Sequence, residues 1–316
     1  MPRDRKEENM ALVKRYEGNP ILSPVVTNDW ESLMVYNCAA IYLGGKVHIL
    51  YRARATIDGV SRIGYACSGD GYHIDERLTQ PVFTGEPANE LESLGCEDPR
   101  LTQIGDRIYM CYSAYGNVPR LERTVRQVQV AMTSISVDDF LARRWDWGER
   151  IYPFPRVDNK NACLFPEKIG GRYAMLHRIP PHIWIAYSDD LREWFASRII
   201  MSPREDWEYF KLGPAGPPIK TEAGWLLIYH AVDRHFHYRL GIALLDLANP
   251  KTVLKRSRWP LLEPETDYET KGVIPNVVFS CGAVVIEDEL FLYYGGADTV
   301  VGVATGKLSE IVHFQE

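Results

Sequence analysis

The sequence predicts an all-β protein, specifically a five-bladed β-propeller. One eleven-residue pattern occurs five times, with starts 52 to 65 residues apart. Each copy opens with a glycine or acidic turn, continues with aromatic and β-branched residues, and ends in polar or aromatic residues. A period of this size built from strands and turns is typical of propeller blades. The copies are GGKVHILYRAR (44–54), GDRIYMCYSAY (105–115), GGRYAMLHRIP (170–180), EAGWLLIYHAV (222–232) and EDELFLYYGGA (287–297).

Each copy is expected to form the second strand of a four-stranded unit. The first strands are expected just before the copies, at YNCAAIYL (36–43), CEDPRLTQI (96–104), NKNACLFPEKI (159–169), GPAGPPIKT (213–221) and FSCGAVVIE (279–287). The third strands are expected just after them, at SRIGYACSGDG (61–71), QVQVAMTSIS (127–136), HIWIAYSDDLREW (182–194), YRLGIALLDL (238–247) and VVGVATGKL (300–308).

Fourth strands are expected in only four of the units. They are PVFTG (81–85), RIYPF (150–154), RIIMSP (198–203) and WPLLEP (259–264). The fifth unit reaches Glu316 without one, and NPILSP (19–24) resembles the other outer strands. We therefore expect this N-terminal strand to complete the last blade and close the ring, which removes an exposed sheet edge.

Composition fits one large domain. With 316 residues and 46% hydrophobic content the chain can bury a sizeable core, and no Gly/Ser linker divides it. We expect a single catalytic domain over 1–316, with 1–15 as a peripheral extension. The first ten residues are too charged for a signal peptide, and no apolar run is long enough to span a membrane.

Charge and cysteine usage narrow the possible partners. The net charge of −6 argues against a nucleic-acid footprint, and the six cysteines show no metal-ligand spacing. We expect a cytoplasmic protein without a metal, a nucleic-acid partner or a membrane partner. The oligomeric state stays open, and a homo-oligomer is one option.

Strand order places the candidate chemistry at one edge of the propeller. In an antiparallel blade, the start of the first strand, the end of the second and the start of the third share an edge. Charged and aromatic residues gather there, whereas the opposite edge carries ordinary turns. They include Asn37, Glu97, Asp98, Arg100, Lys160, Asn161 and Lys211, then Arg52, Arg54, Arg178, His230 and Asp298, then Arg62 and Tyr238. This pattern predicts a site at one mouth of the central channel.

Each of these residues also has an ordinary structural explanation. Asp98 in EDPR is equally explained as a turn aspartate paired with Arg100. Lys160 fits a solvated turn lysine, and His230 fits a satisfied core histidine. The site interpretation depends on coincidence, because five separate blades place such groups at the same edge.

The balance of charge favours an anionic nucleophile. At the level of the inner strands, only the second blade offers carboxylates, Glu97 and Asp98. Inverting hydrolysis by water normally uses two separated carboxyl groups. One acid facing several cations suits inorganic phosphate, which is already charged and needs positioning by charge-assisted hydrogen bonds.

The residues then match a family. The chain resembles the mannoside phosphorylases of glycoside hydrolase family 130 over nearly its whole length. The matching segments are NPIL (19–22), YNCAAIY (36–42), LYRAR (50–54), GCEDPR (95–100), NKNACLFPEKIGGRYAMLHR (159–178), KLGPAGPPI (211–219), GWLLIYHAV (224–232), GIALLDL (241–247), IPNVVF (274–279) and YYGGADT (293–299). The resemblance implies a five-bladed propeller that cleaves β-mannosides with phosphate and inverts the anomeric centre.

The resemblance also implies roles for individual residues. Asp98 is the expected general acid, delivering its proton through the 3-hydroxyl of the sugar. Apart from the resemblance, Glu97 beside it is interpreted as a supporting residue. The expected phosphate ligands are Lys160, Arg178, Lys211, His230 and Tyr238. The expected substrate-binding residues are Asn37, Arg52, Arg62, Arg100 and Asp298. No cofactor is expected, since phosphate is a substrate.

The expected reaction converts a β-linked manno-oligosaccharide or mannosyl disaccharide and phosphate into α-D-mannose 1-phosphate and a shortened acceptor. An inverting β-mannosidase on the same scaffold is the alternative, and a non-catalytic binding propeller is a second one. Phosphate-dependent turnover separates the first two. Linkage, acceptor sugar and chain-length preference stay open.

Overall fold

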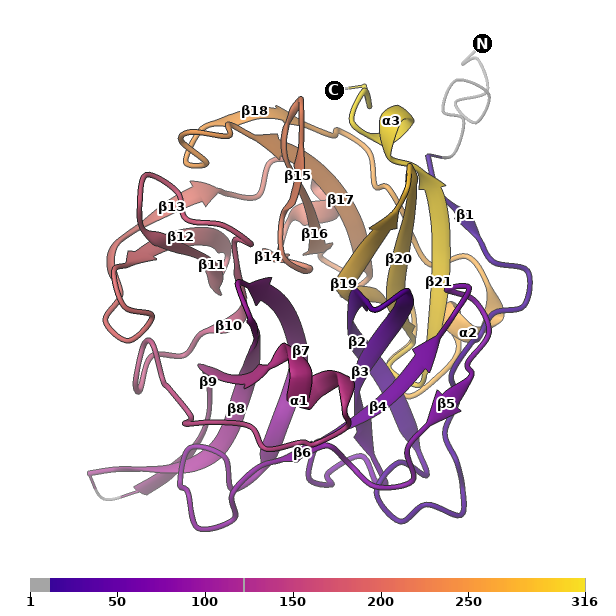
Figure 1. Cartoon of the computed structure of the whole chain (residues 1–316), viewed down its shortest axis with the longest axis vertical. Coiled ribbons are helices and arrows are strands. Elements are labelled where there is room, and N and C mark those ends of the chain that lie inside the picture. The colour runs from indigo at the N-terminus through magenta and orange to yellow at the C-terminus, as the bar shows by residue number, and fades with distance from the viewer. Residues whose placement is uncertain (1–11, 122, 316) are drawn as a thin grey trace.

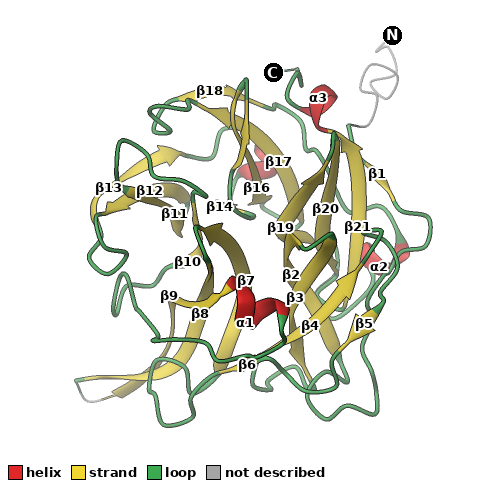
Figure 2. Ribbon diagram, in the orientation of Figure 1, coloured by secondary structure: helices red, strands yellow, loops and turns green. Residues whose placement is uncertain are grey.

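Five antiparallel sheets are arranged in a ring, in the order of the chain (Figure 1). The structure is a computed structural model and describes residues 12–121 and 123–315. Strands make up the blades, and the few helices are single short turns between them (Figure 2). This arrangement confirms the predicted all-β, five-bladed propeller.

The first three blades follow the expected order from the centre outward. Blade one comprises β2 (Met34–Leu43), β3 (Lys46–Arg54), β4 (Arg62–Ser68), β5 (Glu76–Arg77) and β6 (Phe83–Thr84). Blade two comprises β7 (Gly95–Ile104), β8 (Arg107–Arg120) and β9 (Arg123–Ser136). Blade three comprises β10 (Lys160–Leu164), β11 (Tyr173–Ile179), β12 (His182–Ser188) and β13 (Phe195–Met201).

The last two blades complete the ring. Blade four comprises β14 (Lys211–Pro214), β15 (Ile219–Thr221), β16 (Gly224–Val232), β17 (Tyr238–Leu245) and β18 (Val253–Arg256). Blade five comprises β19 (Val278–Ile286), β20 (Glu289–Gly296), β21 (Val300–Lys307) and β1 (Lys14–Arg15). The helical turns are α1 (Val137–Leu141), η1 (Asp206–Glu208), α2 (Asp267–Thr270) and α3 (Leu308–Ile311).

The outer strands are less regular than predicted. In blade two the segment 150–154 contributes one bridge, from Ile151 to Met132. In blade four the paired outer strand is β18, and the predicted segment 259–264 contributes only the bridge from Leu262 to Leu240. Pro260 and Pro264 in that segment lack the backbone N–H that a regular ladder requires.

The N-terminus closes the ring as expected, but over a longer segment. Leu22 bridges Val301 within the predicted strand, and β1 pairs with β21 further upstream. Residues 14 and 15 are therefore part of the fifth blade, which corrects their assignment to a peripheral extension. Leu12 and Val13 also pack against a core cluster, and positions 1–11 of the predicted extension lie outside the described residues.

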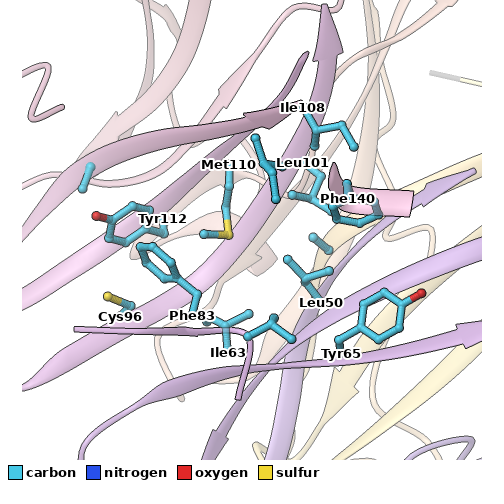
Figure 3. Packing of buried hydrophobic residues seen from close by; sticks show 14 of the residues in the cluster. Leu50, Ile63, Tyr65, Phe83, Cys96, Leu101, Ile108, Met110, Tyr112 and Phe140 are labelled. Atoms are coloured by element: carbon cyan, nitrogen blue, oxygen red, sulfur yellow. The ribbon is translucent and has the colours of Figure 1, made fainter. Parts of the chain in front are cut away.

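The core consists of apolar wedges between neighbouring blades. Figure 3 shows the wedge between blades one and two, where Leu50 and Ile63 meet Met110 and Tyr112. Because side chains alternate along a strand, each second strand serves two wedges. Each fully buried side chain of this kind stabilises the fold by roughly 1.5–3 kcal/mol. All six cysteines are buried and unpaired, as their scattered positions suggested.

Four blades share a buried carboxylate that ties three segments together. In each, a glutamate before the inner strand accepts a hydrogen bond from the tyrosine at the eighth position of the repeat. The same glutamate forms an ion pair with an arginine of the outer segment. These Glu–Tyr–Arg anchors are Glu31 with Tyr51 and Arg77, Glu92 with Tyr112 and Arg150, Glu208 with Tyr229 and Arg256, and Glu269 with Tyr294 and Arg15.

Blade three replaces the anchor with a neutral network. His177 occupies the eighth position, and its two ring nitrogens hydrogen-bond the Asn159 side chain and the Ser197 hydroxyl at 3.0 and 3.1 Å. Burial lowers the pKa of His177 to about 3, so the ring is neutral. The blade therefore needs no buried glutamate to balance a charge.

Glycine in the third strand makes room for the anchor tyrosines. Gly64 lies opposite Tyr51, and Gly241 lies opposite Tyr229. A Cβ at Gly64 would meet the Tyr51 ring at 2.4 Å, and one at Gly241 would meet Tyr229 at 2.7 Å. In these two blades the ring crosses the third strand where that strand has no side chain, and so reaches the outer segment.

The anchor of blade five gives a test of ring closure. Arg15→Ala leaves the fully buried Glu269 carboxylate without its ion-pair partner. Removing one member of a buried pair should lower the free energy of unfolding by about 3 kcal/mol. Lys14→Ala removes a neighbouring charge whose pair with Glu17 is exposed, and should cost about 0–1 kcal/mol. Urea unfolding measures both, and equal losses would contradict the closing role of Arg15.

Candidate active site

Four inner strands carry the same irregularity at the same level. The register shifts between Tyr36 and Ala39 in β2, between Glu97 and Arg100 in β7, between Lys160 and Cys163 in β10, and between Phe279 and Gly282 in β19. A bulge of this kind bends the strand and re-aims a side chain.

At three of these bulges, those of β2, β7 and β10, one residue has a left-handed backbone. Asn37, Asp98 and Asn161 have φ of 46°, 52° and 58°. Asn and Asp tolerate this conformation better than other non-glycine residues. All three side chains line one cavity at the channel mouth. The sequence thus places two amides and one acid around the channel by the same local device.

The cavity has a volume of about 480 Å³, within the usual range for small-molecule sites. Its lining combines polar groups from all five blades with a short apolar wall. It is formed by Asn37, Arg52, Asp98, Asp158, Asn159, Lys160, Asn161, Arg178, Pro180, Lys211, Tyr238, Ile274, Val277, Phe279 and Asp298. The hollow beside α3 is larger, about 900 Å³, but it lacks a buried cluster of ionisable groups.

Asp98 is a buried residue of this cavity and accepts hydrogen bonds from two side chains of blade one. Its Oδ1 accepts hydrogen bonds from Asn37 Nδ2 at 2.9 Å and from Arg52 at 3.0 Å. Burial alone would raise the pKa of Asp98, but attraction to Arg52, Lys160 and Arg100 outweighs it. The pKa of this carboxyl therefore lies well below its ordinary value when the cavity holds no anion.

Glu97 organises the cations around Asp98. Its carboxylate accepts from Arg52 at 2.5 Å, from Arg54 at 2.8 Å and from Lys160 Nζ at 2.9 Å. Although burial works to raise the pKa of Glu97, Arg52 and Lys160 lower it, so the group is ionised. The side chain faces three cations and is absent from the cavity lining, which fits the supporting role expected for it.

Arg178 and Lys211 form a cationic pair without a counter-ion. Neither forms a salt bridge within the described ranges 12–121 and 123–315, and Arg178 Nε is buried without a hydrogen-bond partner. Burial, followed by repulsion from Arg178 and Lys160, lowers the pKa of Lys211 to about 8. Burial likewise lowers the pKa of Arg178 to about 10. Buried cations that destabilise one another in this way create a strong site for an anion.

Tyr238 borders the cationic pair. It lines the cavity, and Lys211 Nζ lies 5.5 Å from the centre of its ring. Burial raises the pKa of Tyr238, so its hydroxyl keeps its proton and can donate to an anion.

His230 lies one layer behind. It is fully buried, does not line the cavity, and accepts from Arg178 through Nε2 at 3.2 Å. Burial and the neighbouring arginines lower the pKa of His230 far below its ordinary value. It is thus a neutral support that orients Arg178, which corrects its expected direct contact with phosphate.

Asp298 completes the polar lining from blade five. Burial raises the pKa of this carboxyl to about 6, reinforced by repulsion from Asp98 and Glu97 and opposed by Arg52 and Lys160. The Oδ1 atoms of Asn37 and Asn161 are buried without partners. Buried acceptors in this state, next to a carboxyl, match the hydroxyls of a sugar ring.

Two predicted substrate residues do not face this cavity. Arg100 is buried and donates to the main-chain carbonyls of Asp98, Pro214 and Ala215. It fixes the bulge of blade two against blade four, which corrects its expected contact with substrate. Arg62 lines a separate hollow of about 380 Å³ beside Trp30, so its expected place among the sugar ligands is also corrected.

The other predicted residues converge. Asn37, Arg52, Asp98, Lys160, Arg178, Lys211, Tyr238 and Asp298 all line the one cavity. Asp98 is not closed off by an ion pair with the Arg100 side chain, since Arg100 binds the main-chain oxygen of Asp98. Sequence reasoning did not assign a role to Asn161. An Asn or Asp occurs at the same position of three inner strands, and this pattern in the sequence could have identified Asn161 as a site residue.

No group of three or more His, Cys, Asp and Glu side chains suited to a metal ion occurs within 12–121 and 123–315. In the same described part of the chain, no helix is long and apolar enough to cross a membrane.

Comparison with known proteins agrees with this geometry. A family model described as beta-1,4-mannooligosaccharide phosphorylase, glycoside hydrolase family 130, matches residues 3–316. The chain is 44% identical to a 1,2-beta-oligomannan phosphorylase of Thermoanaerobacter sp. (strain X514), covering 96% of this chain and 99% of the relative. It is 46% identical to a beta-1,2-mannobiose phosphorylase of the same organism, covering 93% and 97%.

A solved structure gives the same result. The Listeria innocua beta-1,2-mannobiose phosphorylase in complex with beta-1,2-mannobiose superposes with a TM-score of 0.80 at 31% identity, covering 95% of this chain and 98% of that one. Fold, cavity and sequence coincide over almost the whole length, and the chain belongs to glycoside hydrolase family 130, the family of mannoside phosphorylases.

Proposed function

We propose that this protein is an inverting β-mannoside phosphorylase acting on β-1,2-linked substrates. It transfers the terminal mannosyl unit to inorganic phosphate and releases α-D-mannose 1-phosphate and a shortened acceptor. The β-1,2 linkage is favoured by the relatives of 44% and 46% identity, which are named for that linkage. Their names differ in whether a disaccharide or a longer chain is the substrate.

One observation carries the proposal. Arg178 and Lys211 line a cavity that also holds the buried acid Asp98 and two amides with buried, unpartnered acceptors, and neither cation has a carboxylate partner among the described residues. Asp158 and Asp298 also line the cavity, so the unbalanced cations, and not the number of carboxyl groups, distinguish phosphate from a base-activated water. Two unbalanced cations instead suit a phosphate that attacks on its own charge.

The residues divide the reaction between two sides of the sugar. Asn37, Arg52 and Asp298 hold the mannosyl ring, while Lys160, Arg178, Lys211 and Tyr238 hold phosphate. A phosphate oxygen forms the new bond to C1 as the bond from C1 to the glycosidic oxygen breaks on the opposite face. Asp98 supplies the proton that the departing oxygen needs, directly or through the 3-hydroxyl of the ring, and regains one from solvent. The product phosphate releases a proton, so charge and protons balance without a cofactor.

Phosphate binding prepares Asp98 for this role. The acid must carry a proton, yet in the unliganded cavity Arg52 and Lys160 hold the pKa of Asp98 low. A phosphate dianion beside Lys160 offsets that attraction and raises the pKa of Asp98. Proton donation is thereby linked to occupancy of the phosphate site.

The first test is phosphate dependence. Release of mannose 1-phosphate from β-1,2-mannobiose should require inorganic phosphate, and sulfate should compete for the cationic site. Ion chromatography of the products distinguishes mannose 1-phosphate from free mannose. Equal release of free mannose with and without phosphate would establish a β-mannosidase instead.

A second test addresses the acid. Asp98→Asn should lower kcat by roughly 10²–10⁴, the usual contribution of general acid catalysis. In an aryl β-mannoside made from an acidic phenol, the phenolate departs without being protonated. The same variant should therefore lose far less activity on this substrate. Glu97→Gln keeps Asp98 and should be milder on the natural substrate. Full activity of Asp98→Asn on mannobiose would remove the assignment.

The cationic pair predicts a pH dependence. The pKa of Lys211 is lowered to about 8, so its ammonium is charged below that pH and neutral above it. Because phosphate binds the charged form, kcat/KM for phosphate should fall as pH rises, by roughly fivefold between pH 8 and pH 9. In Lys211→Arg the guanidinium stays charged, and the fall should move to higher pH. An unchanged profile in Lys211→Arg would show that another group titrates.

A further inference from the structure

Two aromatic side chains stand exposed beside the cavity on blade four. Phe210 precedes the cavity residue Lys211, and Phe236 lies in the loop between β16 and β17, two residues before the cavity residue Tyr238. Their exposed fractions are 47% and 59%, and their rings pack edge to face with centres 5.2 Å apart. We call this pair the aromatic platform.

The platform is continuous with the phosphate site. Lys211 Nζ lies 5.5 Å from the ring centre of Phe210 and 5.5 Å from that of Tyr238. Neither Phe210 nor Phe236 lines the cavity itself. The two rings therefore lie at the rim, where a ligand that fills the cavity emerges.

The loop that carries Phe236 is held in place. Asp233 Oδ1 accepts from the backbone N–H groups of His235 and His237 at 2.8 and 3.0 Å, and Oδ2 accepts from Arg239 at 2.8 Å. These bonds fix both flanks of Phe236. The aromatic ring is therefore presented on a rigid loop.

Phe236 also has a costly backbone conformation. Its φ is 64°, in the left-handed region that bulky residues rarely adopt. A strained, half-exposed phenylalanine does not serve the core, and such outliers concentrate at sites that bind ligands. Phe210 is likewise absent from the core wedges, although its backbone N–H is bonded to Val232 at 2.8 Å.

We propose that the aromatic platform is a binding subsite for the sugar units of a β-mannan oligosaccharide beyond the disaccharide at the cleavage site. One face of a β-mannopyranosyl ring carries the axial C–H bonds of C1, C3 and C5, and this apolar face stacks on an aromatic ring. The cavity encloses the transferred sugar and phosphate, so a longer chain must leave over the rim. This proposal rests on the proposed function and assigns the chain-length preference to Phe210 and Phe236.

The test compares two substrate lengths. For the linkage that the wild-type protein cleaves, KM is measured for the disaccharide and the tetrasaccharide. Phe210→Ala and Phe236→Ala should each raise KM for the tetrasaccharide roughly 2- to 10-fold, the range expected for one aromatic face contact. KM for the disaccharide, and kcat for both, should stay unchanged.

Matched variants control for other effects. Phe195→Ala removes an exposed phenylalanine on β13 that does not line the cavity and should change neither KM. Phe210→Tyr and Phe236→Tyr keep the aromatic face and should behave like the wild type. Thermal unfolding confirms that the alanine variants remain folded. Equal KM changes for both substrates, or no change for either, would overturn the proposal.

Two further outcomes are distinguished directly. If the alanine variants change the sedimentation coefficient but not the length dependence, the platform is an interface between copies of the chain, and the proposal fails. If the wild type cleaves no β-mannoside, the proposed function fails, and saturation-transfer NMR with β-1,2-mannotetraose and no phosphate still tests the platform. The proposal is supported if the outer sugar units are saturated in the wild type and not in Phe236→Ala. It is refuted if these sugar units are not saturated in the wild type.

Discussion

The anchor glutamates hold this propeller's active edge in position. Each lies three to nine residues before an inner strand and is bonded to the second strand and the outer segment of its own blade. Glu92 precedes the bulge that presents Asp98, and Glu208 precedes Lys211. A buried carboxylate is costly unless it is paired, so the loop has only one favourable position. The same interaction that closes each blade therefore positions the start of its inner strand.

Blade three departs from the anchors where the chemistry requires it. Asn159 bonds the buried His177 on one side and lines the cavity on the other. A glutamate here would add a negative charge near Lys160 and Arg178. The neutral network preserves the positive potential that an anionic substrate needs.

The cavity contains buried charges that destabilise the protein when the site is empty and favour binding of an anion. Around Asp98 and Glu97, attraction to Arg52 balances the charges, whereas Arg178 and Lys211 repel each other. Strain of this kind is relieved when an anion enters. Lys160 lies between the two halves, since it is bonded to Glu97 and lines the cavity beside Arg178. Because an ammonium has three donors, it can keep Glu97 and also contact phosphate.

The sequence alone determined the blade count, the edge at which the site lies, and eight of the residues that converge there, because strand period and chain order fix which ends of the strands meet. It did not determine the outer strands, where proline and isolated bridges replace regular pairing. Tertiary structure alone decided that Arg100 and His230 act from behind the cavity and that Arg62 lies elsewhere. Position along a strand places a Cα at the mouth, but partners up to 115 residues away in the chain decide which way a long side chain points. The left-handed backbone of Asn37, Asp98 and Asn161 likewise becomes visible only in three dimensions, since it is the bulge, formed by pairing with the second strand, that turns these side chains into the channel.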